Sequence, residues 1–426
     1  MPYRIAGIDV HKRMLAVVVS DVEVDGEYAF ERRPFGSNPA QLRWLAEWLL
    51  EPQVEEVVME STAQYWKPVW GSLERYWKPV CQKREGARPM SGTLHLAQAQ
   101  SNRAPRGRKN DFADAERLVK RLVAQELVLS FVPDPEQRLW RTLMRRRYQT
   151  TRNRVQLQNR LEALLEEAHL KLSSLVSDLL GASARRMLQA LADGETDAAS
   201  LAALADYRLR ATPEQLRDAL GACRELHPVY RRLLKMALEE LQLIEKQRGQ
   251  LDQEMADLLR PHQGSVERLA EVPGLGANSA QQIVAEVGVT AATFPSPAEL
   301  SSWVGACPGE DESAGVSHGH RSPKGNRPMR RILNQAANAA VKHKGSIFEL
   351  LYRRYVPRLG HNQTIGVIAH RLCRLIWKIL RQGVRYEERG PAVSKRSKQA
   401  RAARMIRELR SLGYRVEIAN SQLPAP

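Results

Sequence analysis

The stretch YRIAGIDVHKRMLAVVVS, residues 3–20, decides the fold of the first part of the chain. Ile and Val dominate two runs within it, 3–9 and 14–20, and runs of this kind predict β-strands. Residues 22–30 are expected to continue the sheet as a hairpin that turns at Asp25-Gly26. The chain therefore begins with a β-sheet.

Helix and strand signals alternate downstream of this sheet. Asn38-Pro39 predicts the start of a helix that runs to about residue 50, because Asn caps helices and Pro suits their first turn. Residues 54–59 predict another buried strand, and residues 65–76 predict a helix with a Trp-rich face.

A short strand is expected near Val80, before the segment SNRAPRGRKND at 101–111. That segment opens a further predicted helix, from about Phe112 to Gln125. The order of the signals predicts an α/β domain over residues 1–130.

Two long helices are predicted in residues 131–262. The stretch from Arg138 to Arg160 contains eight arginines and no acidic residue, Gly or Pro. A second stretch carries an apolar seam at alternating spacings of three and four residues, interrupted only by Arg248, which predicts a coiled coil. The residues of the seam are Leu234, Ala237, Leu241, Ile244, Leu251, Met255 and Leu258. The two helices are expected to pair within one chain or between chains, so this part is also the predicted oligomerisation region.

A C-terminal domain of helices and tight turns is expected over residues 263–388, and a basic tail over 389–426. The length of 426 residues suits several domains. The four cysteines lie far apart, which argues against a zinc site and a disulfide framework. We expect a cytoplasmic bacterial protein that is neither secreted nor inserted in a membrane.

The net charge of +17 and the pI near 9.9 point to a polyanionic partner. The basic residues of the chain form several separate runs instead of one amphipathic anchor, which favours nucleic acid over a membrane surface as the partner.

Four acidic residues form the candidate chemical site. Asp9 closes the first predicted strand and Glu60 closes the fourth, while Asp111 and Asp114 lie three apart at a helix start. Adjacent parallel strands bring their carboxyl ends together, so these oxygens are expected to hold two Mg²⁺ or Mn²⁺ ions for phosphodiester chemistry. The alternative is that Asp111 caps its helix, Glu60 is an ordinary strand-end acid and Asp9 belongs to a turn.

Three segments around these acids, GIDVHK, VVMESTAQYW and RKNDFADAERL, resemble the acidic blocks of the RuvC-like DEDD transposases of bacterial insertion sequences and the Piv-type invertases. The resemblance places Asp9, Glu60, Asp111 and Asp114 on the four acidic positions of that family. It implies an RNase H-like N-terminal domain.

The segments VPGLGANSAQQIVAEVG and WVGACPGEDESAGVSHGHRSPKGNRPMRRILNQAA resemble the C-terminal transposase domain of the same family, with its Ser-x-Gly element at Ser313. The resemblance covers about 1–125 and 265–385. It implies a recombinase guided by a bridge RNA that pairs with donor and target DNA. Ser313 would form a phosphoserine link, and a different protomer of a homo-oligomer, a dimer or a tetramer, would complete the acidic site.

Further residues are candidates for binding nucleic acid. PGLG, residues 273–276, resembles the hairpin of helix-hairpin-helix modules, in which glycines let backbone N–H groups approach a phosphate, although such turns are also common between packed helices. Basic side chains follow Ser313 and others line the first long helix, where the alternative is a solvated face. The candidates are Gly274, Gly276, Arg321, Lys324, Arg327, Arg330, Arg331, Arg145, Arg146, Arg147, Arg152 and Arg154.

Two other functions remain open from the sequence. One is a RuvC-like metal-dependent endonuclease or Holliday-junction resolvase that forms no covalent intermediate. The other is a non-catalytic scaffold that binds nucleic acid and does not need the four carboxylates.

Overall fold

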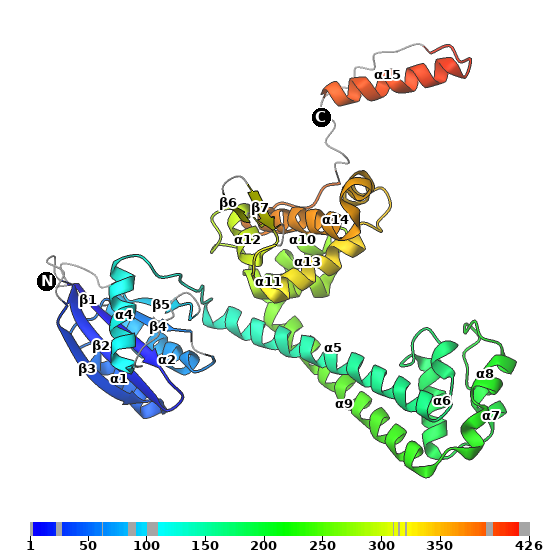
Figure 1. Ribbon diagram of the computed structural model, residues 1–426, viewed down its shortest axis with the longest axis horizontal. Helices are drawn as coiled ribbons and strands as arrows, with labels where there is room; N and C mark the ends of the chain where they lie inside the picture. Colours follow the sequence, from blue (N-terminus) through cyan, green and yellow to red (C-terminus); the bar gives the residue numbers. More distant parts are fainter. Residues whose placement is uncertain are drawn as a thin grey trace. The chain divides into compact units, whose positions relative to one another are not determined.

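A computed structural model describes residues 3–22, 28–61, 63–83, 91–99, 110–309, 311–313, 316–319, 322–388 and 395–416 (Figure 1). The chain divides into two compact units, Met1–Asp134 and Pro135–Pro426. The predicted change from an α/β region to a largely helical region is confirmed.

The first unit is built on a five-stranded mixed sheet with the strand order β3-β2-β1-β4-β5. The strands are β1 (Tyr3–Val10), β2 (Met14–Val22), β3 (Phe30–Gly36), β4 (Glu56–Glu60) and β5 (Thr93–Ala97). β2 is antiparallel to both β1 and β3, whereas β1, β4 and β5 are parallel. The carboxyl ends of β1 and β4 therefore lie side by side.

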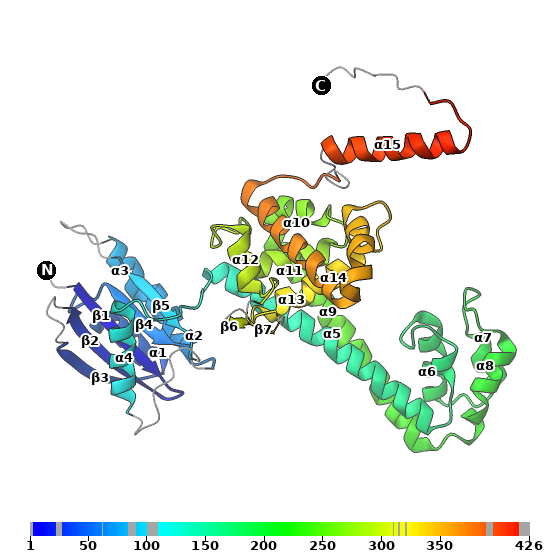
Figure 2. The same ribbon diagram turned by 45° about the horizontal axis from the view of Figure 1, so that its top comes forward.

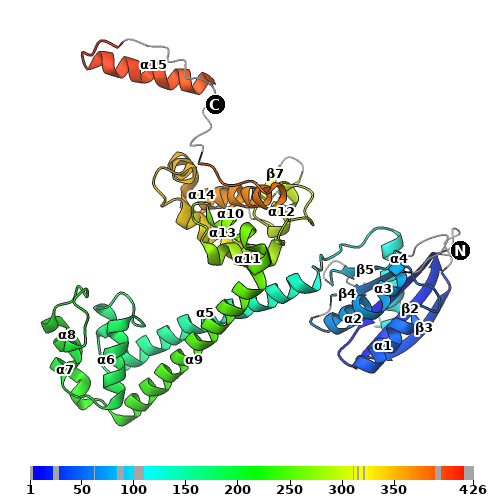
Figure 3. The same cartoon turned by 180° about the vertical axis from the view of Figure 1, so that it is seen from behind.

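Helices cover both faces of this sheet (Figures 1 and 3). They are α1 (Pro39–Trp48), α2 (Trp66–Ser72), a π-helical turn (Leu73–Trp77), α3 (Lys78–Lys83) and α4 (Asp111–Val123). α4 packs on β1, β2 and β4. A Cβ atom on Gly7 would lie 2.3 Å from the carbonyl oxygen of Ala115, so only glycine allows α4 to approach β1 this closely.

Three details of the predicted order need correction. The third strand occupies Phe30–Gly36 instead of 22–30, and the predicted turn at Asp25-Gly26 lies outside the described residues. The strand expected near Val80 is wrong, because Lys78–Lys83 continues the preceding helix and buries Cys81. The parallel strand that follows is β5, which the sequence analysis missed.

Two long helices, α5 (Pro135–Glu167) and α9 (Pro228–Leu259), pack against each other in the second unit (Figure 2). Leucines from both, among them Leu157, Leu161 and Leu241, join one buried cluster. The ion pairs Arg147–Asp252, Arg154–Glu245 and Arg160–Glu240 show an antiparallel arrangement, because one number rises as the other falls. The helices thus pair within one chain.

Short helices connect α5 to α9. They are η2 (Leu172–Ser174), α6 (Ala182–Asp193), α7 (Ala198–Ala203), α8 (Pro213–Ala219) and η3 (Gly221–Glu225). Their apolar side chains share the buried cluster of the long helices, so this end of the unit has its own core.

A second core lies in the C-terminal part of this unit, where Trp140 and Met144 of α5 also contribute. Its elements are η4 (Arg260–His262), α10 (Gln263–Ala270), α11 (Ala277–Val287), α12 (Pro297–Val304), β6 (Asp311–Ser313), β7 (Val316–Gly319), α13 (Arg327–Ala340) and α14 (Ile347–Gln382). α15 (Lys395–Ser411) follows. None of the described helices is long and apolar enough to cross a membrane.

Candidate functional site

The carboxylates of Asp9 and Glu60 belong to neighbouring parallel strands. Ile8 of β1 pairs with Met59 of β4, so the next residues, Asp9 and Glu60, follow in the same register. Side chains alternate between the faces of a strand, and Gly7, two residues before Asp9, contacts α4. Asp9 therefore lies on the sheet face that α4 covers.

The other two predicted acids lie in the first turn of α4, where the helix dipole favours negative charge. Asn110 caps this helix, since its side chain accepts hydrogen bonds from the backbone N–H groups of Phe112 (3.1 Å) and Ala113 (3.5 Å). The alternative that Asp111 caps the helix is therefore wrong. Asp114 accepts a hydrogen bond of 2.8 Å from Arg117.

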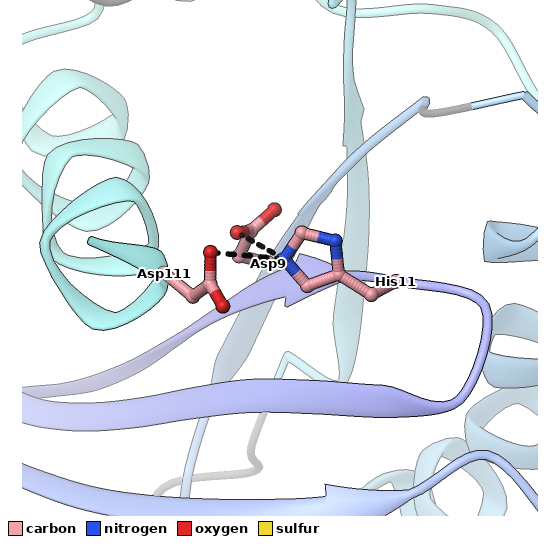
Figure 4. A group of neighbouring side chains, drawn as sticks. All are labelled: Asp9, His11 and Asp111. Atoms are coloured by element: carbon pink, nitrogen blue, oxygen red, sulfur yellow. Dashed lines mark ion pairs between the residues drawn. The ribbon is translucent and has the colours of Figure 1, made fainter. Parts of the chain in front are cut away.

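His11 is a member of the site that the sequence analysis missed. Its Nε2 lies 3.1 Å from Oδ2 of Asp9 and 3.2 Å from Oδ1 of Asp111 (Figure 4). Ligand atoms of the three residues all lie within 4.8 Å of one another. The signal was present in GIDVHK, where His11 follows Asp9 by two residues and can reach the same face.

The electrostatics of Asp9 connect all four predicted acids. Burial raises the pKa of Asp9 most, His11 lowers it, and the charges of Asp114, Asp111 and Glu60 raise it further. These three carboxylates are thus close enough to oppose ionisation of Asp9. The structure thus gathers Asp9 and Asp111 around His11, with Glu60 and Asp114 near enough to Asp9 to affect its pKa.

The residues present fit a divalent metal ion. Asp9 is only 8% exposed, and its Oδ2 forms no hydrogen bond with the described residues, although Nε2 of His11 lies 3.1 Å away. A buried carboxylate that lacks hydrogen bonds is unfavourable unless a cation compensates its charge. Carboxylate oxygens suit hard divalent ions, and an imidazole nitrogen adds a ligand that transition metals also accept.

Several arginines of helix α5 form ion pairs with acidic residues of the same chain. Glu286 of α11 is 2% exposed, and Arg145 donates two hydrogen bonds of 3.0 Å to its carboxylate. Arg147 pairs with Asp252, and Arg154 with Glu245. Arg146 and Arg152 are exposed and form no ion pair within the described part of the chain. Of the five predicted contact residues on this helix, these two are the ones available to a ligand.

The two glycines of PGLG differ in environment. Gly274 has a φ of 87°, and a Cβ atom there would lie 2.2 Å from the carbonyl oxygen of Ala336. Close packing of this turn on α13 thus requires a glycine at position 274. This agrees with the alternative that PGLG is a turn between packed helices. A Cβ atom on Gly276, the N-cap of α11, would meet nothing within 4 Å. Only Gly276 leaves space for a ligand.

Ser313 is the last residue of β6 and pairs with Val316 of β7. Its side chain, all of Ala314 and Gly315, and Arg321 lie outside the described part of the structure. Lys324, Arg327 and Arg330 of the predicted basic strip are exposed.

Arg331, the last residue of this strip, is turned towards the protein. Its guanidinium lies 3.7 Å from the ring centroid of Tyr148, and it donates a hydrogen bond of 2.7 Å to Gln282. Burial lowers its pKa. Arg331 thus packs α13 against α5 and α11.

Two segments of the chain match families of known proteins. Residues 6–170 match a transposase family model of the DEDD type named after IS110. Residues 266–353 match the model described as "Transposase IS116/IS110/IS902 family". The two matched segments contain the acidic site and the β6–β7 hairpin, respectively.

Two curated proteins are similar over part of the chain. The "Insertion element IS110 uncharacterized 43.6 kDa protein" of Streptomyces coelicolor is 29% identical over 153 residues, which cover 36% of this chain and 37% of the relative. A "Probable family 20 transposase" of Pseudomonas aeruginosa is 25% identical over 152 residues, covering 35% and 44%. The similarity thus spans less than half the length of either relative.

Proposed function

We propose that this chain, whose two matched segments are domains of the IS110/IS116 family of transposases, cleaves and rejoins DNA strands during the transposition of an insertion element. The observation that carries the proposal is the convergence of Asp9, Glu60, Asp111 and Asp114 at the ends of β1 and β4 and the start of α4. Such a set of carboxylates suits phosphodiester chemistry.

The N-terminal unit is proposed to have the RuvC-like, RNase H-like fold. The sheet order β3-β2-β1-β4-β5 supports this proposal, together with an antiparallel first half and a parallel second half. The domain boundaries 1–130, 131–262, 263–388 and 389–426 remain part of the proposal, as does the description of α5 and α9 as a coiled coil.

Asp9, Glu60, Asp111 and Asp114 are proposed to hold Mg²⁺ or Mn²⁺, with His11 beside them. When bound, such ions stabilise charge on the attacking and leaving oxygens of a phosphodiester. The chain's own contribution is placement, because Gly7 brings α4 onto β1 and Asn110 fixes the first turn of α4.

Ser313 is proposed as the nucleophile. Its hydroxyl would lose a proton, its oxygen would bond to phosphorus, and the bond from phosphorus to one deoxyribose oxygen would break, with that oxygen taking up a proton. The resulting ester retains the energy of the broken strand for rejoining. The matched C-terminal segment and the resemblance around Ser313 support this step.

A bridge RNA that pairs with donor and target DNA is proposed as the guide, and a homo-oligomer, a dimer or a tetramer, as the working assembly. The net charge of +17 and the exposed Arg146 and Arg152 support a nucleic-acid partner beyond the cleaved strand.

The test is to incubate the protein with donor DNA, target DNA and RNA transcribed from the flanks of its element, with and without Mg²⁺. Recombinant DNA that depends on Mg²⁺ and RNA supports the whole proposal. Cleavage without joined products or an adduct would favour the resolvase alternative, and binding without cleavage would favour the scaffold.

A further inference from the structure

A cavity of about 650 Å³ lies in the C-terminal part of the second unit, between the end of α12, α13 and α14. Gly305 to Pro308, which precede β6, form one wall, and Ser322, which follows β7, forms another. The β6–β7 hairpin therefore leaves and rejoins the domain at this cavity. Its volume is typical of sites for small ligands.

Three residues with side-chain amides, from two helices, line the cavity. Asn334 belongs to α13, and Asn362 and Gln363 belong to α14. An amide offers both donors and an acceptor, which suits the edge of a nucleobase. In Asn334 the amide oxygen also accepts a hydrogen bond of 3.3 Å from Asn338, which leaves its NH₂ group as the donor. Asn362 and Gln363 are exposed and form no hydrogen bond with other described residues, so their amides are available.

The charge of the lining favours an anion over a cation. Arg330 is exposed at the cavity, and the described lining contains no Asp or Glu. α14 is interrupted at Gly360, where φ is 74° and ψ is 173°. The helix that restarts at His361 leaves its first N–H groups without helical acceptors, and such groups attract phosphate.

Apolar atoms supply the remaining walls. Leu359 and Val367 are partly exposed and line the cavity, and such apolar surfaces suit the faces of an aromatic base. His370 also lines it; burial and the nearby Arg374 and Arg371 lower the pKa of this imidazole. The neutral ring, with one donor and one acceptor, is favoured at pH 7.

We propose that this cavity binds one unpaired nucleotide of a DNA strand, with its base between the amides of Asn362, Gln363 and Asn334 and its phosphate at Arg330. This inference rests on the proposed function, because the hairpin that carries Ser313 makes DNA the expected strand at this place. A base held outside the duplex would fix the adjoining phosphodiester near the hairpin.

The test uses a short single-stranded DNA with one 2-aminopurine, whose fluorescence responds when the base leaves its stacked neighbours. The Asp9→Asn variant serves as the background, because it is expected not to cleave. We expect a saturable change in fluorescence. Gly366 lines the cavity and a Cβ atom there meets nothing within 4 Å, so Gly366→Trp should fill the cavity and abolish the change.

Gly249→Trp is the matched control, because Gly249 is a helical glycine of α9 with equally open surroundings. It should leave the fluorescence change intact. Asn362→Leu and Gln363→Leu should each raise Kd about tenfold, the effect of one lost hydrogen bond. If circular dichroism shows that Gly366→Trp does not fold, these two variants at exposed positions test the proposal instead.

An undiminished fluorescence change in Gly366→Trp, or in both leucine variants, would overturn the proposal. So would a change seen only with the corresponding RNA oligonucleotide. Failure of the proposed function is a separate result, because wild-type protein could lack strand cleavage while the Asp9→Asn background still binds the unpaired base.

Discussion

The Nε2 atom of His11 lies 3.2 Å from Oδ1 of Asp111, which connects the residue after β1 to the first turn of α4. This contact depends on the close approach of α4 to β1 at Gly7. The candidate metal site is therefore a product of helix-on-sheet packing, and its carboxylates converge because two neighbouring strands end where one helix begins.

Asp9→Asn or Asp114→Asn should abolish Mg²⁺-dependent DNA cleavage and leave nucleic-acid binding largely intact. Each change removes one carboxylate charge without altering the basic surfaces. Cleavage of labelled DNA and an electrophoretic mobility shift measure the two effects. Glu47→Gln, at an exposed position of α1, is the control and should cleave normally. Full cleavage by both aspartate variants would exclude the metal site.

His11→Ala should change the preference among metal ions. An imidazole nitrogen favours Mn²⁺ and Co²⁺ over Mg²⁺, since Mg²⁺ prefers oxygen ligands. We expect the variant to lose affinity for Mn²⁺ by a larger factor than for Mg²⁺, as measured by titration calorimetry. Equal losses for both ions would mean that His11 only positions the carboxylates.

The acidic site was largely predictable, whereas His11 was not singled out. Asp9 and Glu60 follow strongly apolar runs, so their place at strand ends follows from local sequence. Their lateral pairing needed the parallel register of β1 and β4, which is a tertiary property. Asn110 shows the limit of local rules, because either it or Asp111 could cap α4 and only the backbone geometry decides.

Arg146→Gln combined with Arg152→Gln should weaken RNA binding without lowering stability. Each lost phosphate contact is expected to flatten the dependence of log Kd on log salt by about one unit. Arg145→Gln should instead destabilise the protein by roughly 1.5 to 3 kcal/mol, because it removes a charged hydrogen-bond partner of buried Glu286. Salt titrations and thermal melting separate the two effects. An unchanged slope in the double variant would place the RNA site elsewhere.

The acid-free stretch from Arg138 to Arg160 within α5 was the least reliable guide in the sequence. A run without acids resembles a nucleic-acid surface, but its partners Glu240, Glu245 and Asp252 lie on α9, far along the chain. Ion pairs with residues so distant in sequence cannot be recognised from the sequence of one helix alone. The prediction of a strand near Val80 was wrong for a related reason, since it also ignored contacts with distant residues. Burial of Cys81 against the rest of the unit stabilises a helix there.

Glu245 should make the contacts of α9 with α6 and α5 sensitive to acid. A hydrogen bond from Arg185 lowers the pKa of Glu245, and Arg154 adds to this effect. A carboxyl with a depressed folded pKa stabilises above its unfolded pKa, about 4.3, and that stability is lost as pH falls through the lower folded value. Hydrogen exchange in α9 should therefore be faster in Glu245→Gln than in wild type at about pH 7.

The difference should shrink as the pH falls through the lowered folded pKa of Glu245, because wild-type Glu245 then becomes protonated as well. Glu239→Gln is the control, since Glu239 is exposed on the same helix. A constant difference at all pH values would assign the effect to packing and not to the charge of Glu245.

Ser313→Ala should abolish both recombination and the covalent protein–DNA adduct. A nuclease that uses water needs no serine at this position, whereas strand exchange benefits from an ester that stores the energy of the broken bond. Labelled DNA, guide RNA and wild-type protein should yield, after denaturation, DNA that migrates with the polypeptide. Asp9→Asn should also lack the adduct, although its Ser313 is intact, because the hydroxyl needs the acidic site for reaction.

Mixing Ser313→Ala with Asp9→Asn then tests assembly between protomers. Restored adduct means that one subunit supplies the serine and another supplies the carboxylates. Recombination by Ser313→Ala at the wild-type rate, or no wild-type adduct even on nicked DNA that traps intermediates, would exclude the serine mechanism and favour the resolvase alternative.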